Sequence, residues 1–138
     1  YFRAALGKDA EGVFGMTPWV ISPVSHDRWF GDAQQFAQSF QHRFHYEPDY
    51  HVASAVADIE TYAYALEAAG TLDREKVRDA IAKSDFECLY APIRYQANGQ
   101  IDIPQIVIQV QAGQVVPIYT DHFLNKPIYP VPVWAKRK

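Results

Sequence analysis

The sequence predicts an α/β fold in which three consecutive helices precede β-hairpins and an extended, proline-rich tail. Apolar residues recur at helical spacing between Ala33 and Ile81, and from Pro92 onward the period changes to two. Near the end of the chain, Pro127, Pro130 and Pro132 keep the backbone extended and poorly able to join a sheet interior.

A short strand is expected in the apolar segment GVFGMTPWVISP, residues 12–23. Its β-favouring residues support a strand, whereas Pro18 and Pro23 limit how far it runs. We therefore expect a short strand followed by an extended crossing.

The first predicted helix lies in GDAQQFAQSFQHRFHY, residues 31–46. Phe36, Phe40 and Phe44 repeat every four residues and form one apolar stripe, which we expect in the core. Asp32 is followed three residues later by Gln35, a capping-box-like start.

Two further helices are expected after Pro48. The longer one has an apolar stripe with steps of four and three, and Gly70 stands where a left-handed C-terminal cap belongs. Its stripe consists of Val52, Val56, Ile59, Ala63 and Leu66. Asp73 is the expected N-cap of the next helix, DREKVRDAIAKS, whose core-facing residues are Val77, Ala80 and Ile81.

Two hairpins are expected after the helices. The segment IRYQANGQID contains Asn98-Gly99, the dipeptide that most favours a tight hairpin turn. The segment QIVIQVQAGQVVPIY alternates Gln with β-branched residues around Ala112-Gly113, which predicts a hairpin with one buried face and one wet face. The tail NKPIYPVPVWAKRK is expected to be a strap laid over the surface, with Tyr129, Val131 and Trp134 docked on the parent domain.

Composition excludes several classes of protein. The 138 residues fall within the usual size of one domain, and the net charge of −3 gives no footprint for nucleic acid. No apolar run approaches the roughly 20 residues of a membrane-spanning helix. The single cysteine, Cys88, excludes an internal disulfide and a zinc cluster of several thiolates.

A metal site is the first functional possibility, because His42, His45 and His51 lie near Glu47 and Asp49. Polar residues at a helix end that complement its dipole explain the same pattern more simply, and no HExxH spacing is present. We therefore expect no metal.

A catalytic centre is the second possibility. A nucleophile needs an adjacent base and an oriented third group, but the sequence has no GxSxG elbow and Cys88 lies in an ordinary approach to a strand. The sequence also has no glycine loop that would hold phosphate. The acids Glu47 and Asp49 flank a proline just before a helix, where negative charge is favourable. We expect no enzyme and no cofactor.

A family resemblance favours binding. The FxxxFxxxF helix, PDYH opening a long alanine-rich helix, AGTLDREKVRDAI, the NGQ hairpin and the YPVPVW tail occur in an order and spacing that span nearly the whole chain. Together they resemble the C-terminal part of the branched-chain amino-acid class of ABC-transporter substrate-binding proteins. The resemblance implies part of a periplasmic-binding-protein type I fold, with two α/β lobes, three crossing strands and a ligand cleft between the lobes.

Members of this family have chains more than twice as long, so the resemblance implies that the chain is a fragment. Residues 1–21 would then be the end of the second lobe and an interlobe crossing. Residues 22–104 would be the first-lobe helices and hairpin, and residues 105–138 the third crossing and a C-terminal strap. Missing structure would expose apolar surface and sheet edges, so we expect the fragment to self-associate.

The resemblance places the first turn of the second helix at the edge of the cleft, with Trp19 beside the crossing. The candidate ligand-binding residues are Trp19, Tyr50, His51 and Val52. Free N–H groups at a helix N-terminus attract an anionic group, His51 can donate to a carboxylate, and Tyr50 or Trp19 can stack on an apolar body. The alternative is that Tyr50 and Trp19 serve packing and that His51 is solvated.

The implied function is capture of a small-molecule ligand, an amino acid or a related, even aromatic, organic acid, for an ABC permease at the inner membrane. Hinge closure would trap the ligand. The implied location is the periplasm, reached by a signal peptide that this chain does not contain. The alternatives are a ligand-sensing receptor or regulatory domain of the same fold, and a self-contained enzyme.

Overall fold

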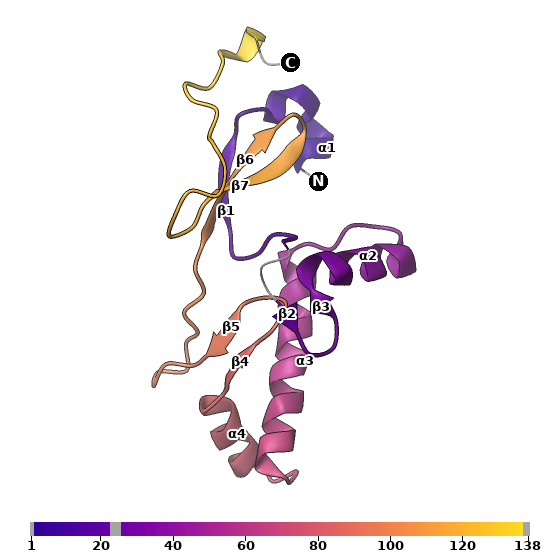
Figure 1. Cartoon of the computed structure of the whole chain (residues 1–138), viewed down its shortest axis with the longest axis vertical. Helices are drawn as coiled ribbons and strands as arrows, with labels where there is room; N and C mark the ends of the chain where they lie inside the picture. Colours follow the sequence, from indigo (N-terminus) through magenta and orange to yellow (C-terminus); the bar gives the residue numbers. More distant parts are fainter. Residues whose placement is uncertain (1, 23–25, 137–138) are drawn as a thin grey trace. The chain divides into compact units, whose positions relative to one another are not determined.

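The computed structural model describes residues 2–22 and 26–136. The chain divides into two compact units, the first formed by Tyr1–Pro18 with Pro104–Lys138 and the second by Trp19–Ile103 (Figure 1). Pro23, which is expected to limit the first strand, lies outside the described residues.

The first unit contains a three-stranded antiparallel sheet in the order β1-β6-β7. Strand β1 is Phe14–Thr17, β6 is Ile106–Gln111 and β7 is Gln114–Tyr119, and a short α1, Phe2–Leu6, with the 3₁₀ turn η1, Gly7–Ala10, precedes them. Both the short first strand and the second predicted hairpin are confirmed. At the turn, Ala112 and Gly113 have φ of 50° and 74°, so both are left-handed, as tight hairpin turns require. The sequence analysis did not predict α1 or η1.

The prediction that the glutamines of β6 face solvent is wrong for Gln109, which is fully buried. Its Nε2 donates to the carbonyl oxygens of Gly12, at 3.2 Å, and Ile128, at 3.1 Å. Its Oε1 accepts from the N–H of Ile128, at 2.9 Å. Burial is tolerated because the amide is satisfied by backbone groups that the sequence places far away.

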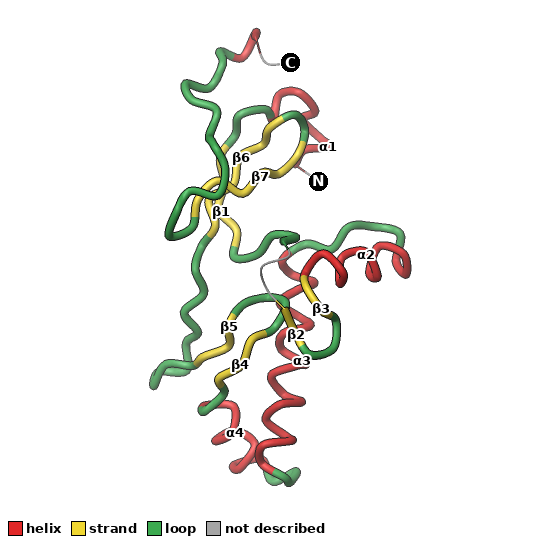
Figure 2. The backbone as a smooth tube through the Cα atoms, in the orientation of Figure 1, coloured by secondary structure: helices red, strands yellow, loops and turns green. Residues whose placement is uncertain are grey.

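The proline-rich tail forms no strand within the described residues, as expected, although the N–H groups of Leu124 and Asn125 at its start donate to the carbonyl oxygen of Ile118 in β7 (Figure 2). Gln111 Nε2 donates to the carbonyl oxygen of Lys126, so the side chains of β6 hold the backbone of residues 126–128. The tail ends in a 3₁₀ turn, η2, Trp134–Lys136. Tyr129 and Trp134 remain exposed within the described chain, so their docking on a parent domain stays a prediction.

The second unit contains the three consecutive helices that the sequence predicts, shown in red in Figure 2. They are α2, Ala33–Phe44, α3, Tyr50–Ala69, and α4, Arg74–Ala82. Two short antiparallel hairpins accompany them, β2, His26–Asp27, with β3, Gly31–Asp32, and β4, Asp85–Glu87, with β5, Pro92–Arg94.

Local signals set the helix ends as predicted. Asp32 Oδ1 accepts from Gln35 N–H at 2.7 Å and Gln35 Oε1 accepts from Asp32 N–H at 3.0 Å, which completes the capping box. Asp73 caps α4, and Gly70 ends α3 with a left-handed φ of 60°. A turn also forms at the predicted place, but the bond from Gly99 N–H to the carbonyl oxygen of Gln96 centres it on Ala97 and Asn98 rather than on Asn98-Gly99.

The core of the second unit is centred on Trp19, Ala33, Phe36, Ala53 and Leu89, with Phe40, Val52, Val56 and Tyr90 packed around them. Two packing predictions are wrong here. Phe44 is 55% exposed, because this cluster includes Phe36 and Phe40 but ends one turn before Phe44. Ile59 is 71% exposed, because α3 buries a different stripe, Ala53, Ala57, Thr61 and Ala65, whose small side chains allow close approach.

Candidate functional site

The first turn of α3 is defined by its cap. Asp49 Oδ1 accepts from the N–H groups of His51, at 3.0 Å, and Val52, at 3.2 Å. His45 ends α2 with a left-handed φ of 63°. Partial burial acts to raise the pKa of Asp49, but the hydrogen bond from Val52 and the interactions with His51 outweigh it and hold this pKa below its usual value. The Asp49 side chain of this turn is therefore ionised over a wider pH range than an ordinary aspartate.

Tyr50 and His51 lie together on the surface of this turn. Their rings stack with centroids 3.9 Å apart and an interplanar angle of 30°. His51 Nδ1 also lies 3.5 Å from Asp49 Oδ2, and both side chains are largely exposed. The pair presents an aromatic face and an imidazole edge to whatever lies in front of the helix.

Trp19 and Val52 lie together in the core instead. Trp19 is only 5% exposed, and its Nε1 donates to the carbonyl oxygen of Leu89 at 2.8 Å. Val52 is half-buried against the same cluster. The four predicted residues thus fall into two pairs, one at the surface and one beneath it.

Tyr90 is a residue near this turn that the sequence analysis missed. It packs against both core clusters of the unit. Burial raises the pKa of its phenol, a hydrogen bond with Ser54 lowers it, and the charges of Tyr50 and Asp58 raise it. Tyr90 comes from the segment between β4 and β5, where no periodic pattern marks it, so only the tertiary structure brings it to α3.

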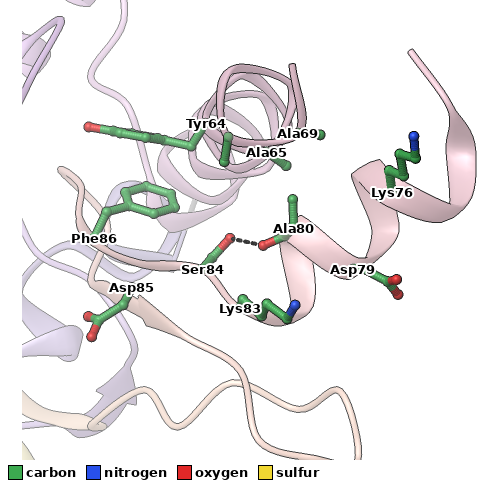
Figure 3. Close-up of a pocket in the computed structure, with 11 residues that line it drawn as sticks. Tyr64, Ala65, Ala69, Lys76, Asp79, Ala80, Lys83, Ser84, Asp85 and Phe86 are labelled. Atoms are coloured by element: carbon green, nitrogen blue, oxygen red, sulfur yellow. Dashed lines mark hydrogen bonds between the residues drawn. The ribbon is translucent and has the colours of Figure 1, made fainter. Parts of the chain in front are cut away.

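A hollow of about 580 Å³ lies between α3, α4 and β4, away from this turn (Figure 3). Alanines such as Ala65 and Ala80 line it, and Tyr64 and Phe86 stack at one end with centroids 3.9 Å apart. Of its two carboxylates, Asp79 is paired with Arg78 and Asp85 with Arg94, the latter at 2.6 Å. Nothing in this arrangement pairs a nucleophile with a base.

No helix in the described part of the chain is long and apolar enough to span a bilayer. Within residues 2–22 and 26–136, no three His, Cys, Asp or Glu side chains are grouped so as to hold a metal ion.

Comparison with known families identifies the family of this chain. A sequence model of the family described as periplasmic binding protein matches residues 3–114. The chain belongs to the periplasmic binding protein family. This confirms the resemblance found in the sequence, and because the family consists of binding proteins, it agrees with the expectation of a non-enzymatic function.

Solved periplasmic binding proteins share the fold. The leucine binding protein LivK of Thermotoga maritima has a TM-score of 0.68 at 24% identity, over 84% of this chain and 32% of its own. The solute binding protein of an R. palustris ABC transporter, in complex with benzoate, has a TM-score of 0.69 at 17% identity, over 88% of this chain and 33% of its own. LivJ of Streptococcus pneumoniae, in complex with isoleucine, has a TM-score of 0.67 at 18% identity, over 83% of this chain and 32% of its own.

This periplasmic binding protein chain therefore spans about a third of the length of the solved structures that it matches. At these identities the structural likeness shows the fold alone. The mixed α/β architecture predicted from the sequence is confirmed as part of the periplasmic binding protein fold.

Proposed function

We propose that the protein containing this chain captures an amino acid or a related small organic acid for ABC-type uptake. The observation that carries the proposal is the family match over residues 3–114. Two of the similar structures are named for, or contain, branched aliphatic amino acids, and one contains benzoate. These ligands share a carboxylate and an apolar body, which is the chemistry that the first turn of α3 is suited to bind.

The proposed contact surface is this first turn, within a cleft between two lobes of the whole protein. Side chains beyond the Asp49 cap supply an imidazole donor at His51 and an exposed aromatic face at Tyr50. The helix N-terminus favours negative charge, but the Asp49 carboxylate already accepts from the N–H groups of His51 and Val52, so the proposed bond to the ligand carboxylate comes from the His51 imidazole. Trp19 and Val52 would form the apolar wall beneath the turn, with Trp19 acting through its bond to the Leu89 carbonyl.

The wider assignments follow from the family and belong to the same proposal. The ligand would be trapped by hinge closure, because a ligand shifts a two-state equilibrium by its differential affinity for the closed state. The whole protein would act in the periplasm and deliver its ligand to an ABC permease at the inner membrane. The predicted boundaries, 1–21, 22–104 and 105–138, assign the chain to lobes and crossings of that protein.

A thermal-shift screen of the full-length protein against amino acids and aromatic acids tests the ligand class. Stabilisation should grow with ligand concentration relative to the dissociation constant. Flat melting temperatures across both classes would reject the ligand assignment.

The residue assignment is tested separately by His51→Ala. Loss of a charge-assisted hydrogen bond should weaken affinity by roughly tenfold to a hundredfold, and His42→Ala, an exposed histidine on α2, is the matched control. Equal affinities of the His51→Ala variant and wild-type protein would remove His51 from the site and leave the ligand class intact.

A further inference from the structure

Three buried ionisable side chains meet in the second unit without an obvious role. Asp27 on β2 is 5% exposed, Glu60 in the middle of α3 is 3% exposed, and Cys88 between β4 and β5 is fully buried. Asp27 Oδ2 and both carboxylate oxygens of Glu60 make no hydrogen bond of normal geometry within the described chain. Buried polar atoms are normally paired, so these three oxygens need an explanation.

Within the described residues, no cation compensates the two acids. The groups that face Glu60 are the Asp27 carboxyl, from the β2 side, and the Cys88 thiol, from the β4–β5 segment. The neighbouring guanidinium of Arg28 turns outward instead and forms two bonds to Glu67, of 2.8 and 2.7 Å. Two carboxylates left ionised here would be buried, mutually repulsive and unpaired, which is strongly unfavourable.

The titration behaviour agrees with this geometry. Burial and the negative charge of Asp27 raise the pKa of Glu60 to about 7. Burial raises the pKa of Cys88 to about 11, so the thiol stays neutral. Glu60 is therefore the group that changes charge near neutral pH.

We propose that Asp27 and Glu60 bind one proton in common and that this protonated acid pair ties the β2–β3 turn to α3. Asp27 Oδ1 already accepts from the N–H groups of Trp29 and Phe30, both at 2.6 Å, and so fixes the turn. Its remaining oxygen, Oδ2, is buried without a partner, and the Asp27 carboxyl is the acid whose charge acts on Glu60. A proton on either carboxyl provides the O–H donor that the unpaired oxygens lack.

The turn held in this way forms part of an apolar hollow on α3. Trp29 and Phe30 line this hollow, of about 700 Å³, together with Phe40, Tyr46, Val56 and Ile59, and Glu60 also borders it. Loss of the shared proton places two like charges between the turn and the helix. The acid pair thus makes the packing of the turn, and the wall of the hollow, depend on pH.

The direction of the pH effect follows from the raised pKa. Between the ordinary value of 4.5 and about 7, folded Glu60 keeps its proton while unfolded Glu60 loses it. The folded state then binds more protons, so stability falls as pH rises through this window and levels off above it.

The test compares urea midpoints of the whole chain between pH 5 and 8.5 in wild type, Glu60→Gln and Asp58→Asn. Glutamine mimics the neutral acid, and Asp58 is an exposed carboxylate on the same helix. The midpoint of wild type and of Asp58→Asn should fall with rising pH relative to that of Glu60→Gln. In parallel, amide exchange at Trp29 and Phe30, corrected for intrinsic base catalysis, should speed up above pH 7 in wild type and Asp58→Asn but not in Glu60→Gln.

Parallel pH profiles for wild type and Glu60→Gln would overturn the proposal. If Glu60→Gln does not fold, the carboxyl ¹³C resonance of Glu60 in the wild-type chain decides. A titration midpoint near 7 supports the shared proton, and a midpoint near the ordinary value for glutamate overturns it.

Discussion

The buried amide of Gln109 offers the sharpest test of how the first unit is held together. Replacing it by leucine keeps the size of the side chain but removes three bonds to the backbone, at Gly12 O, Ile128 O and Ile128 N–H, and the bond that Gln109 Oε1 accepts from Gln111 Nε2. Each net hydrogen bond is worth about 1 kcal/mol, and the loss of each bond to the backbone leaves a backbone group unpaired. We expect Gln109→Leu to lower the free energy of unfolding by about 3 kcal/mol.

Urea denaturation measures this loss, and amide exchange at Ile128 reports whether the tail is released. Gln114→Leu is the matched control, because Gln114 is an exposed glutamine at the start of β7. The reasoning fails if the two variants are equally stable, or if Ile128 remains as protected in Gln109→Leu as in wild type.

Three further outcomes follow from the second unit. Asp49→Ala removes the N-cap of α3 and should lower the free energy of unfolding, measured by urea denaturation, by about 1 kcal/mol. The difference from wild type should become smaller at acid pH, because wild-type Asp49 is protonated as the pH falls through its lowered pKa. Trp19→Phe leaves the buried Leu89 carbonyl without its indole donor and should cost about 1–3 kcal/mol, whereas an unchanged midpoint would show that the bond is dispensable. Ile59 and other large apolar side chains are exposed, so sedimentation of this chain alone should show a dimer or a larger species. Ile59→Lys should weaken this self-association, and a clean monomer of the wild-type chain would contradict the prediction.

The features that the sequence predicts correctly are local. The Asp32–Gln35 capping box, the Gly70 cap and the Ala112-Gly113 turn each depend on residues within a few positions of one another. Their hydrogen bonds and backbone angles are dictated by the residue types at those positions. Such signals fix where helices and hairpins begin and end.

The features that it misses depend on partners far along the chain. Gln109 and Gly12 are 97 residues apart, so alternation alone assigns Gln109 to the wet face. The buried face of α3 is likewise selected by its packing partners, which favour the alanine stripe over the stripe containing Ile59. At the candidate site, the cap positions Tyr50 and His51 predictably, whereas the approach of Tyr90 does not follow from any local pattern.

Gln109 and Glu60 show two different uses of a buried polar side chain. The amide of Gln109 is neutral at every accessible pH and is matched by backbone groups on two other segments, so its contribution is constant. The carboxyl of Glu60 has the same length but no such partners, and a second acid faces it. The contribution of Glu60 to stability must therefore vary with the proton that it holds. Gln109 stabilises its unit equally at every pH, whereas Glu60 stabilises its unit in a pH-dependent way.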